Sequence, residues 1–158
     1  PGAQYGPSKR WPTHYFAALA DMIVQDLGMK VHMLPGKEEQ GLVRRIYEDV
    51  KNKDNVSIIP LGVRDLKVCL SRASAVVSND TGPRHISVAL SVPTVVLLGP
   101  MDDGYTHYPN AHTYPLHKDV PCRPCNKKRC DRGHECLSLI TPEDVMIKLG
   151  GILGSKGQ

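Results

Sequence analysis

Several features that define other protein classes are missing from this sequence. It contains no run of 18 apolar residues, so we expect no membrane-spanning helix. No charged segment followed by an apolar segment opens the chain, and the five cysteines are an odd number; both features favour a reducing, cytoplasmic setting. Aromatic residues are scarce, with one Trp and one Phe, so aliphatic side chains must fill the core.

The two common nucleotide-binding fingerprints are also absent. There is no G-x-G-x-x-G motif, and Gly36-Lys37 lacks both the upstream glycine and the following Ser or Thr of a P-loop. Dinucleotide-dependent oxidoreductases and P-loop NTPases are therefore disfavoured. The net charge of +4 suits a phosphate-bearing ligand or an anionic membrane surface, but it is far below the charge of a dedicated nucleic-acid-binding protein.

The sequence does contain an alternation of helical and strand-like segments. Apolar residues recur at helical spacing from Thr13, a candidate N-cap, to Gly28, and four further helical segments follow. Short apolar runs between them predict strands; these are residues 30–34, 56–59, 75–78 and 94–98. This order is typical of βαβ units, so we expect one α/β domain over residues 1–158, built on a doubly wound parallel sheet.

Two features depart from this pattern. Residues 101–137 are rich in Cys and Pro and lack clear periodicity, so we expect an insertion there. The chain also begins at Pro1 with a loop of the kind that follows a strand, although no strand precedes it. We therefore expect that the chain is a fragment of a longer protein.

Two loops are expected to offer an anion site at the carboxyl ends of strands, where open parallel sheets bind ligands. In loop 2–12, glycines allow close backbone approach and Lys9 suits a phosphate; a solvated loop explains it equally well. In loop 78–85, Asp80 or Thr81 is a candidate N-cap for the next helix, whose first N–H groups attract anions. Taken alone, a plain N-cap is the simpler interpretation of this loop.

A third loop, residues 36–39, follows the second predicted strand. A carboxylate at this position is where doubly wound folds hold a ribose hydroxyl pair, and Glu38 and Glu39 are the candidates. Acidic residues also favour the first turn of any helix, which is the simpler interpretation.

Together the three loops resemble the carboxyl-terminal domain of the lipopolysaccharide heptosyltransferases, glycosyltransferase family 9. The matching stretches keep the family's order and spacing; they are PGAQYGPSKRWP (1–12), SNDTGPRHISVAL (78–90) and PTVVLLGP (93–100). The resemblance covers nearly the whole chain up to the final helix. It implies a Rossmann-like domain that forms the C-terminal half of a GT-B glycosyltransferase.

The resemblance also implies roles for individual residues. The residues that it assigns to donor binding are Ser8, Lys9, Glu39, Asp80, Thr81, Gly82 and His85. Lys9 and Asp80 would be catalytic, with Lys9 on the donor phosphates and Asp80 facing the sugar. Glu39 would hold the ribose and His85 would support the site. Pro83 stands where many family members carry Leu or Met, which removes one backbone donor.

The activity implied by the resemblance is inverting transfer of heptose from ADP-heptose to the inner core of lipopolysaccharide, with no cofactor required. A lipid A-core acceptor and the catalytic base would belong to an N-terminal domain that this chain lacks, so the chain alone would bind donor without turnover. Such an enzyme works in the cytoplasm, at the inner face of the inner membrane, where peripheral membrane contact is expected. The alternative is another GT-B transferase that uses a different nucleotide sugar.

The cysteine cluster supports a different hypothesis. Cys122, Cys125, Cys130 and Cys136 have the compact spacing of a small zinc site, with His117 and His134 as reserve ligands. A structural zinc is therefore a candidate cofactor, and a zinc-knuckle module that binds nucleic acid is the rival function. Residues 120–136 contain no aromatic side chain for base stacking, so we expect no nucleic-acid partner.

Overall fold

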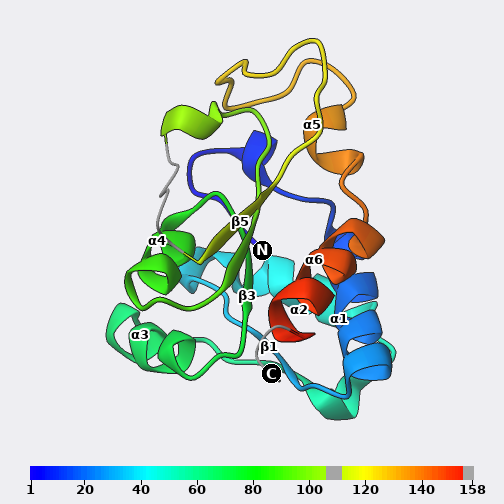
Figure 1. Cartoon of the computed structure of the whole chain (residues 1–158), viewed down its shortest axis with the longest axis vertical. Coiled ribbons are helices and arrows are strands. Elements are labelled where there is room, and N and C mark those ends of the chain that lie inside the picture. Colours follow the sequence, from blue (N-terminus) through cyan, green and yellow to red (C-terminus); the bar gives the residue numbers. More distant parts are fainter. Residues whose placement is uncertain (106–111, 155–158) are drawn as a thin grey trace.

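Helices and strands alternate over residues 13–97, as the apolar pattern predicts (Figure 1). The computed structural model describes residues 1–105 and 112–154. The helices are α1 (Thr13–Leu27), α2 (Gln40–Glu48), α3 (Val63–Ser71), α4 (Gly82–Ala89), α5 (Glu135–Ser138) and α6 (Pro142–Gly154). The strands are β1 (Val31–Met33), β2 (Val56–Ile58), β3 (Val76–Asn79), β4 (Thr94–Leu97) and β5 (Thr113–Leu116).

The ends of α1 illustrate how closely the sequence predicts a helix. Gly28 follows the last helical residue with a φ of 62°, the left-handed conformation that glycine adopts without steric cost. At the other end the prediction is wrong by one residue, because Pro12 is the N-cap and Thr13 is already helical.

The strands pair in parallel, which confirms the predicted α/β class, but they form two sheets. In one sheet β1 pairs with β2, with Val31 opposite Val56. In the other the order is β3-β4-β5, and Val95 of β4 lies between Val77 and Tyr114. The parallel strands and the helices between them form the predicted doubly wound arrangement. The two sheets remain separate, because β1 and β3 are not hydrogen-bonded to each other.

Helices cover β4 on both sides and create the core. α1 packs against α2 and α6, and α6 reaches β4, whereas α4 packs on β3 and β4 with α3 beside it (Figure 1). All four residues of β4 are buried, as expected for a strand covered on both faces. Within residues 1–105 and 112–154, no helix has the length and apolar character needed to cross a membrane.

The segment expected to be an insertion contains a strand of the main sheet. β5 lies within residues 101–137 and pairs with β4 over its whole length. Its Thr-Tyr-Pro-Leu sequence gave no strand signal, because it is a half-buried edge strand and edge strands tolerate proline. Residues 106–111 of this segment lie outside the described part of the chain.

Candidate functional site

Two of the predicted loops lie side by side at the carboxyl end of β3. Asn79, the last residue of that strand, is buried and joins them. Its side-chain oxygen accepts the Trp11 N–H at 3.3 Å, and its amide nitrogen donates to the Pro1 carbonyl at 2.6 Å. Trp11 is buried as well, and its indole N–H donates to the Ile140 carbonyl at 2.8 Å. These contacts bring residues 1–11 against the start of the β3–α4 loop, as the sequence predicts.

A buried cluster of three charged side chains forms where these loops meet. Lys9 Nζ lies 2.6 Å from one oxygen of the Asp80 carboxylate and donates to the Asp80 carbonyl at 3.3 Å. Arg84 Nη1 lies 2.5 Å from the other carboxylate oxygen. The side chains of Asp80 and Arg84 are each 2% exposed and that of Lys9 is 10% exposed. The cluster carries two positive charges and one negative charge, so a net charge of +1 is buried at this edge.

The electrostatics of the cluster keep Asp80 ionised. Burial alone would raise the pKa of its carboxyl, but the hydrogen bond and charge of Lys9, with the charge and hydrogen bond of Arg84, lower it below the usual value. Both carboxylate oxygens are already engaged by cations. Asp80 therefore acts in this structure mainly as the anion that holds Lys9 and Arg84 in place.

The first turn of α4 adds backbone donors beside the cluster. Gly82 and Pro83 are the first two helical residues, and Thr81 is the N-cap. The Thr81 hydroxyl donates to the Asn79 carbonyl at 3.3 Å, so neither Thr81 nor Asp80 caps the helix with its side chain. The first N–H groups of an α-helix lack partners within the helix and lie at the positive end of its dipole, so an anion is favoured there.

His85 lies on α4 next to Arg84, with its side chain exposed. Partial burial of the ring and the charges of Arg84 and Lys9 outweigh the effect of Asp80 and lower the pKa of His85 below its usual value. The ring is therefore neutral near pH 7 and adds a hydrogen-bonding group without adding charge.

Glu39, and not Glu38, is the residue of the third loop that approaches the site. Its carboxylate accepts the Gly36 N–H at 3.1 Å and packs directly over Gly2. A Cβ atom built on Gly2 would lie 1.9 Å from Glu39 Oε1, so the backbone of the first loop makes room for this carboxylate. Glu38 is exposed.

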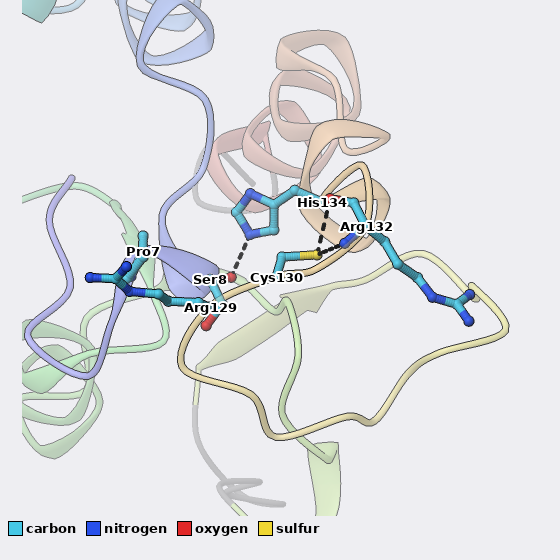
Figure 2. Close-up of a pocket in the computed structure, with 6 residues that line it drawn as sticks. All are labelled: Pro7, Ser8, Arg129, Cys130, Arg132 and His134. Carbon is cyan, nitrogen blue, oxygen red and sulfur yellow. Dashed lines mark hydrogen bonds between the residues drawn. The ribbon is translucent and has the colours of Figure 1, made fainter.

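Ser8 lies in a short 3-10 helix, Pro7–Lys9, and its polar groups face the cysteine-rich segment. Its hydroxyl donates to the Lys127 carbonyl at 2.5 Å, and the side chain of His134 contacts its carbonyl at 2.6 Å. Figure 2 shows this contact beside a pocket of about 330 Å³. The pocket is lined by Pro7, Ser8, Arg129, Cys130, Arg132 and His134. His134 thus faces the turn that carries Lys9.

The zinc site predicted from the cysteine spacing is not assembled. In the part of the chain that the structure describes, no group of three or more His, Cys, Asp and Glu side chains is arranged to hold a metal ion. Cys136 is buried in the core, and Cys130 contacts the Arg132 backbone. All four cysteines, Cys122 and Cys125 included, are free thiols, and burial, with the charges of the neighbouring cysteines, raises the pKa of Cys136 to about 11.

The sequence assigned no donor-site role to two residues that contact this site: Arg84 received no role, and His134 was only a reserve zinc ligand. Arg84 belongs to the stretch 78–90, and the available signal was its place in the first turn of the helix that follows Asp80, where a cation can turn back to a carboxylate before the N-cap. His134 had no local signal at all, because its contact with Ser8 joins residues 126 positions apart.

Comparison with protein families matches residues 1–135 to glycosyltransferase family 9 (heptosyltransferase). The lipooligosaccharide heptosyltransferase 2 of Campylobacter jejuni is 32% identical over 162 residues, which cover 97% of this chain and 49% of the relative. The lipopolysaccharide heptosyltransferase 2 of Salmonella typhimurium is 25% identical, with 99% of this chain and 46% of the relative covered. The chain thus spans about half the length of the curated relatives that it matches.

Solved structures agree on the fold. The glycosyl transferase family 9 structure from Veillonella parvula is 28% identical with a TM-score of 0.83, and 98% of this chain matches 44% of that chain. E. coli ADP-heptose lps heptosyltransferase II matches the whole chain over 46% of its own length, with a TM-score of 0.86 and 23% identity. E. coli heptosyltransferase WaaC with ADP has a TM-score of 0.69 and 24% identity, over 95% of this chain and 42% of its own. The same enzyme with ADP-2-deoxy-2-fluoro heptose has a TM-score of 0.70 and 22% identity, over 94% of this chain and 41% of its own.

Proposed function

Because the chain belongs to glycosyltransferase family 9, we propose that it binds the nucleotide-sugar donor of a heptosyltransferase. The reaction is transfer of heptose from ADP-heptose to the inner core of lipopolysaccharide, with inversion at the anomeric carbon. The names of the relatives support the sugar and the acceptor, and the WaaC structures solved with ADP and an ADP-heptose analogue support the nucleotide.

The observation that carries this proposal is the buried charge beside the first turn of α4. Lys9 and Arg84 together outweigh Asp80 by one positive charge, and the backbone donors of Thr81 and Gly82 lie next to them. A diphosphate carries negative charge and many acceptor oxygens, so it is complementary to these cations and backbone donors. Glu39, which packs over Gly2, would accept hydrogen bonds from the ribose hydroxyl groups of the donor.

The proposed chemistry is stabilisation of the leaving group. As the bond between the sugar and the phosphate breaks, negative charge grows on the departing ADP, and Lys9 and the α4 N-terminus are already in place to neutralise it. Asp80 keeps Lys9 at the sugar end of the donor, and neutral His85 supports the phosphates with a hydrogen bond. The protein's own cations supply the positive charge, so the proposal requires no metal ion.

The remaining parts of the reaction lie outside this chain in the proposal. In this proposal, the catalytic base and the binding site for a lipid A-core acceptor lie in a domain that corresponds to the other half of the relatives. We propose that the chain alone binds donor without turnover. The whole protein would work in the cytoplasm, in peripheral contact with the inner face of the inner membrane that carries its acceptor.

Titration calorimetry of the 158-residue chain with ADP, UDP and a short RNA tests the proposal. We expect ADP to bind, UDP to bind more weakly and RNA not to bind. UDP binding in preference to ADP would indicate a different nucleotide sugar, and RNA binding without ADP binding would overturn the transferase assignment.

The Lys9→Ala variant tests the proposed contact itself. A hydrogen bond to a charged group contributes about 1.5–3 kcal/mol, so ADP affinity should fall by about tenfold or more. Lys148→Ala, which removes an exposed lysine on α6, is the matched control and should leave ADP affinity unchanged. Equal ADP affinity in Lys9→Ala and in the unmodified chain would remove Lys9 from the site.

A further inference from the structure

The turn that carries Lys9 is held by a distant segment of the chain, residues 126–134. The Ser8 N–H donates to the Lys128 carbonyl at 3.3 Å, and the Ser8 hydroxyl donates to the Lys127 carbonyl at 2.5 Å. The Ser8 carbonyl is contacted by His134 Nε2 at 2.6 Å, as Figure 2 shows. Every polar group of Ser8 is thus bound to this one segment.

Tyr5, earlier in the same loop, is also bound to the segment. Its hydroxyl donates to the Asn126 carbonyl at 2.7 Å. The centre of its ring lies 4.8 Å from Lys9 Nζ and 5.8 Å from Lys128 Nζ, so the ring attracts the ammonium groups of both lysines. The segment therefore acts on the side chain of Lys9 through Tyr5, and on its backbone through Ser8.

Close packing shows that the two segments are fitted to each other. A Cβ atom built on Gly6 would lie 2.4 Å from the Lys128 carbonyl oxygen, a distance that real Cβ contacts do not reach. Only glycine therefore allows the backbone of the first loop to approach the segment at this point.

We propose that His134 is a positioning residue for Lys9, and that residues 126–134 set the geometry of the diphosphate site. A carbonyl oxygen can only accept, so His134 must present Nε2–H to Ser8, the residue directly before Lys9. Ser8 is 2% exposed, and its hydrogen bond with His134 is partly buried. The inference rests on the proposed function, because it assigns the segment a role in holding the cation that binds the donor.

The test compares ADP with AMP on two His134 variants. A hydrogen bond contributes about 0.5–1.5 kcal/mol, so His134→Ala should weaken ADP binding about three- to tenfold. AMP, which lacks the second phosphate, should be affected less. His134→Gln keeps an N–H donor near the position of Nε2 and should restore most of the ADP affinity. His32→Ala, an exposed histidine on β1, is the control and should change neither affinity.

A double-variant cycle separates positioning from general support of the fold. If His134 acts through Lys9, then His134→Ala should have little further effect on ADP affinity in a Lys9→Ala background. A purely structural role predicts equal losses for AMP and ADP, additive effects of the two substitutions and no rescue by glutamine; any of these results overturns the inference. If the unmodified chain fails to bind ADP, the proposed function fails instead, so the two failures are distinguishable.

Discussion

Two ion pairs of nearly equal length occupy very different surroundings in this chain. Lys9 and Asp80 are 2.6 Å apart with side chains 10% and 2% exposed, whereas Lys127 and Asp131 are 2.5 Å apart with side chains 52% and 65% exposed. The first pair lies at the carboxyl end of β3 and the second in the cysteine-rich segment. Distance alone therefore does not distinguish a buried pair from a solvated one, and burial decides how strongly water screens the two charges.

The two regions also contribute to the site in different ways. At the end of β3, side chains converge and leave a buried positive charge that can meet a ligand. In the segment 126–134, the charged side chains of Lys127, Lys128, Arg129 and Arg132 are exposed, and the hydrogen bonds to the Lys9 loop come from backbone carbonyls and from the His134 side chain. A charged sequence run is thus compatible with a supporting role that depends on its backbone.

Removal of Asp80 should have the largest effect on stability. The Asp80→Ala variant leaves Lys9 and Arg84 buried without their shared anion, and loss of one partner of a buried pair costs about 3–5 kcal/mol. Urea unfolding followed by circular dichroism measures the free energy of unfolding. Asp80→Asn, which keeps the shape and removes the charge, should also be strongly destabilised. If both variants unfold like the unmodified chain, the cluster is not buried in solution.

Acidification should remove the same contribution gradually. The pKa of Asp80 is lowered in the folded state, so its contribution is complete above the unfolded-state value of about 3.9 and is lost as pH falls through the lower folded-state value. The difference in unfolding free energy between the unmodified chain and Asp80→Ala should therefore be constant from pH 7 to about pH 5 and shrink below about pH 4. A difference that is independent of pH down to pH 2 contradicts an ionised Asp80.

The sequence predicts the fold well where segments are periodic and buried on both faces. α1 and β4 lie within one residue of their predicted bounds, because apolar spacing and Gly28 determine them. β5 was missed because a short, half-buried edge strand containing proline has no periodic signal. The division of the strands into two sheets depends on pairing between distant segments, which local pattern does not report.

The site was predictable where its residues belong to contiguous loops. The meeting of the Lys9 loop with the Asp80 loop follows from the rule that ligands bind at strand ends, and the structure brings these residues together. Cysteine spacing predicts a zinc site that the described residues do not assemble, because spacing alone does not determine how the thiols are oriented toward one another. The contact of His134 with Ser8 depends on the path of a loop without periodicity, so only the structure reveals it.

Gly2→Ala tests the close approach of Glu39 with a moderate expected effect. The added Cβ would overlap the Glu39 carboxylate, and overpacking of this kind costs about 1–2 kcal/mol. Displacement of Glu39 should also lower the affinities for AMP and ADP by the same factor, because both nucleotides contain the ribose. Gly41→Ala on α2 meets no atom within 4 Å and should be neutral or about 0.5 kcal/mol more stable. Unchanged stability and nucleotide affinity in Gly2→Ala would place Glu39 elsewhere.

Asp131→Asn should have the smallest effect and completes the comparison of the two ion pairs. Its hydrogen bond and charge interaction with Lys127 lower the pKa of Asp131 and raise that of Lys127, but both side chains are exposed and exposed pairs are screened by water and salt. We therefore expect the urea midpoint and the ADP affinity to match those of the unmodified chain. The contacts of this segment with the Lys9 turn use the Lys127 and Lys128 carbonyls, which the substitution leaves in place. A clear loss of ADP affinity in Asp131→Asn would mean that the Lys127–Asp131 ion pair also acts on the diphosphate site.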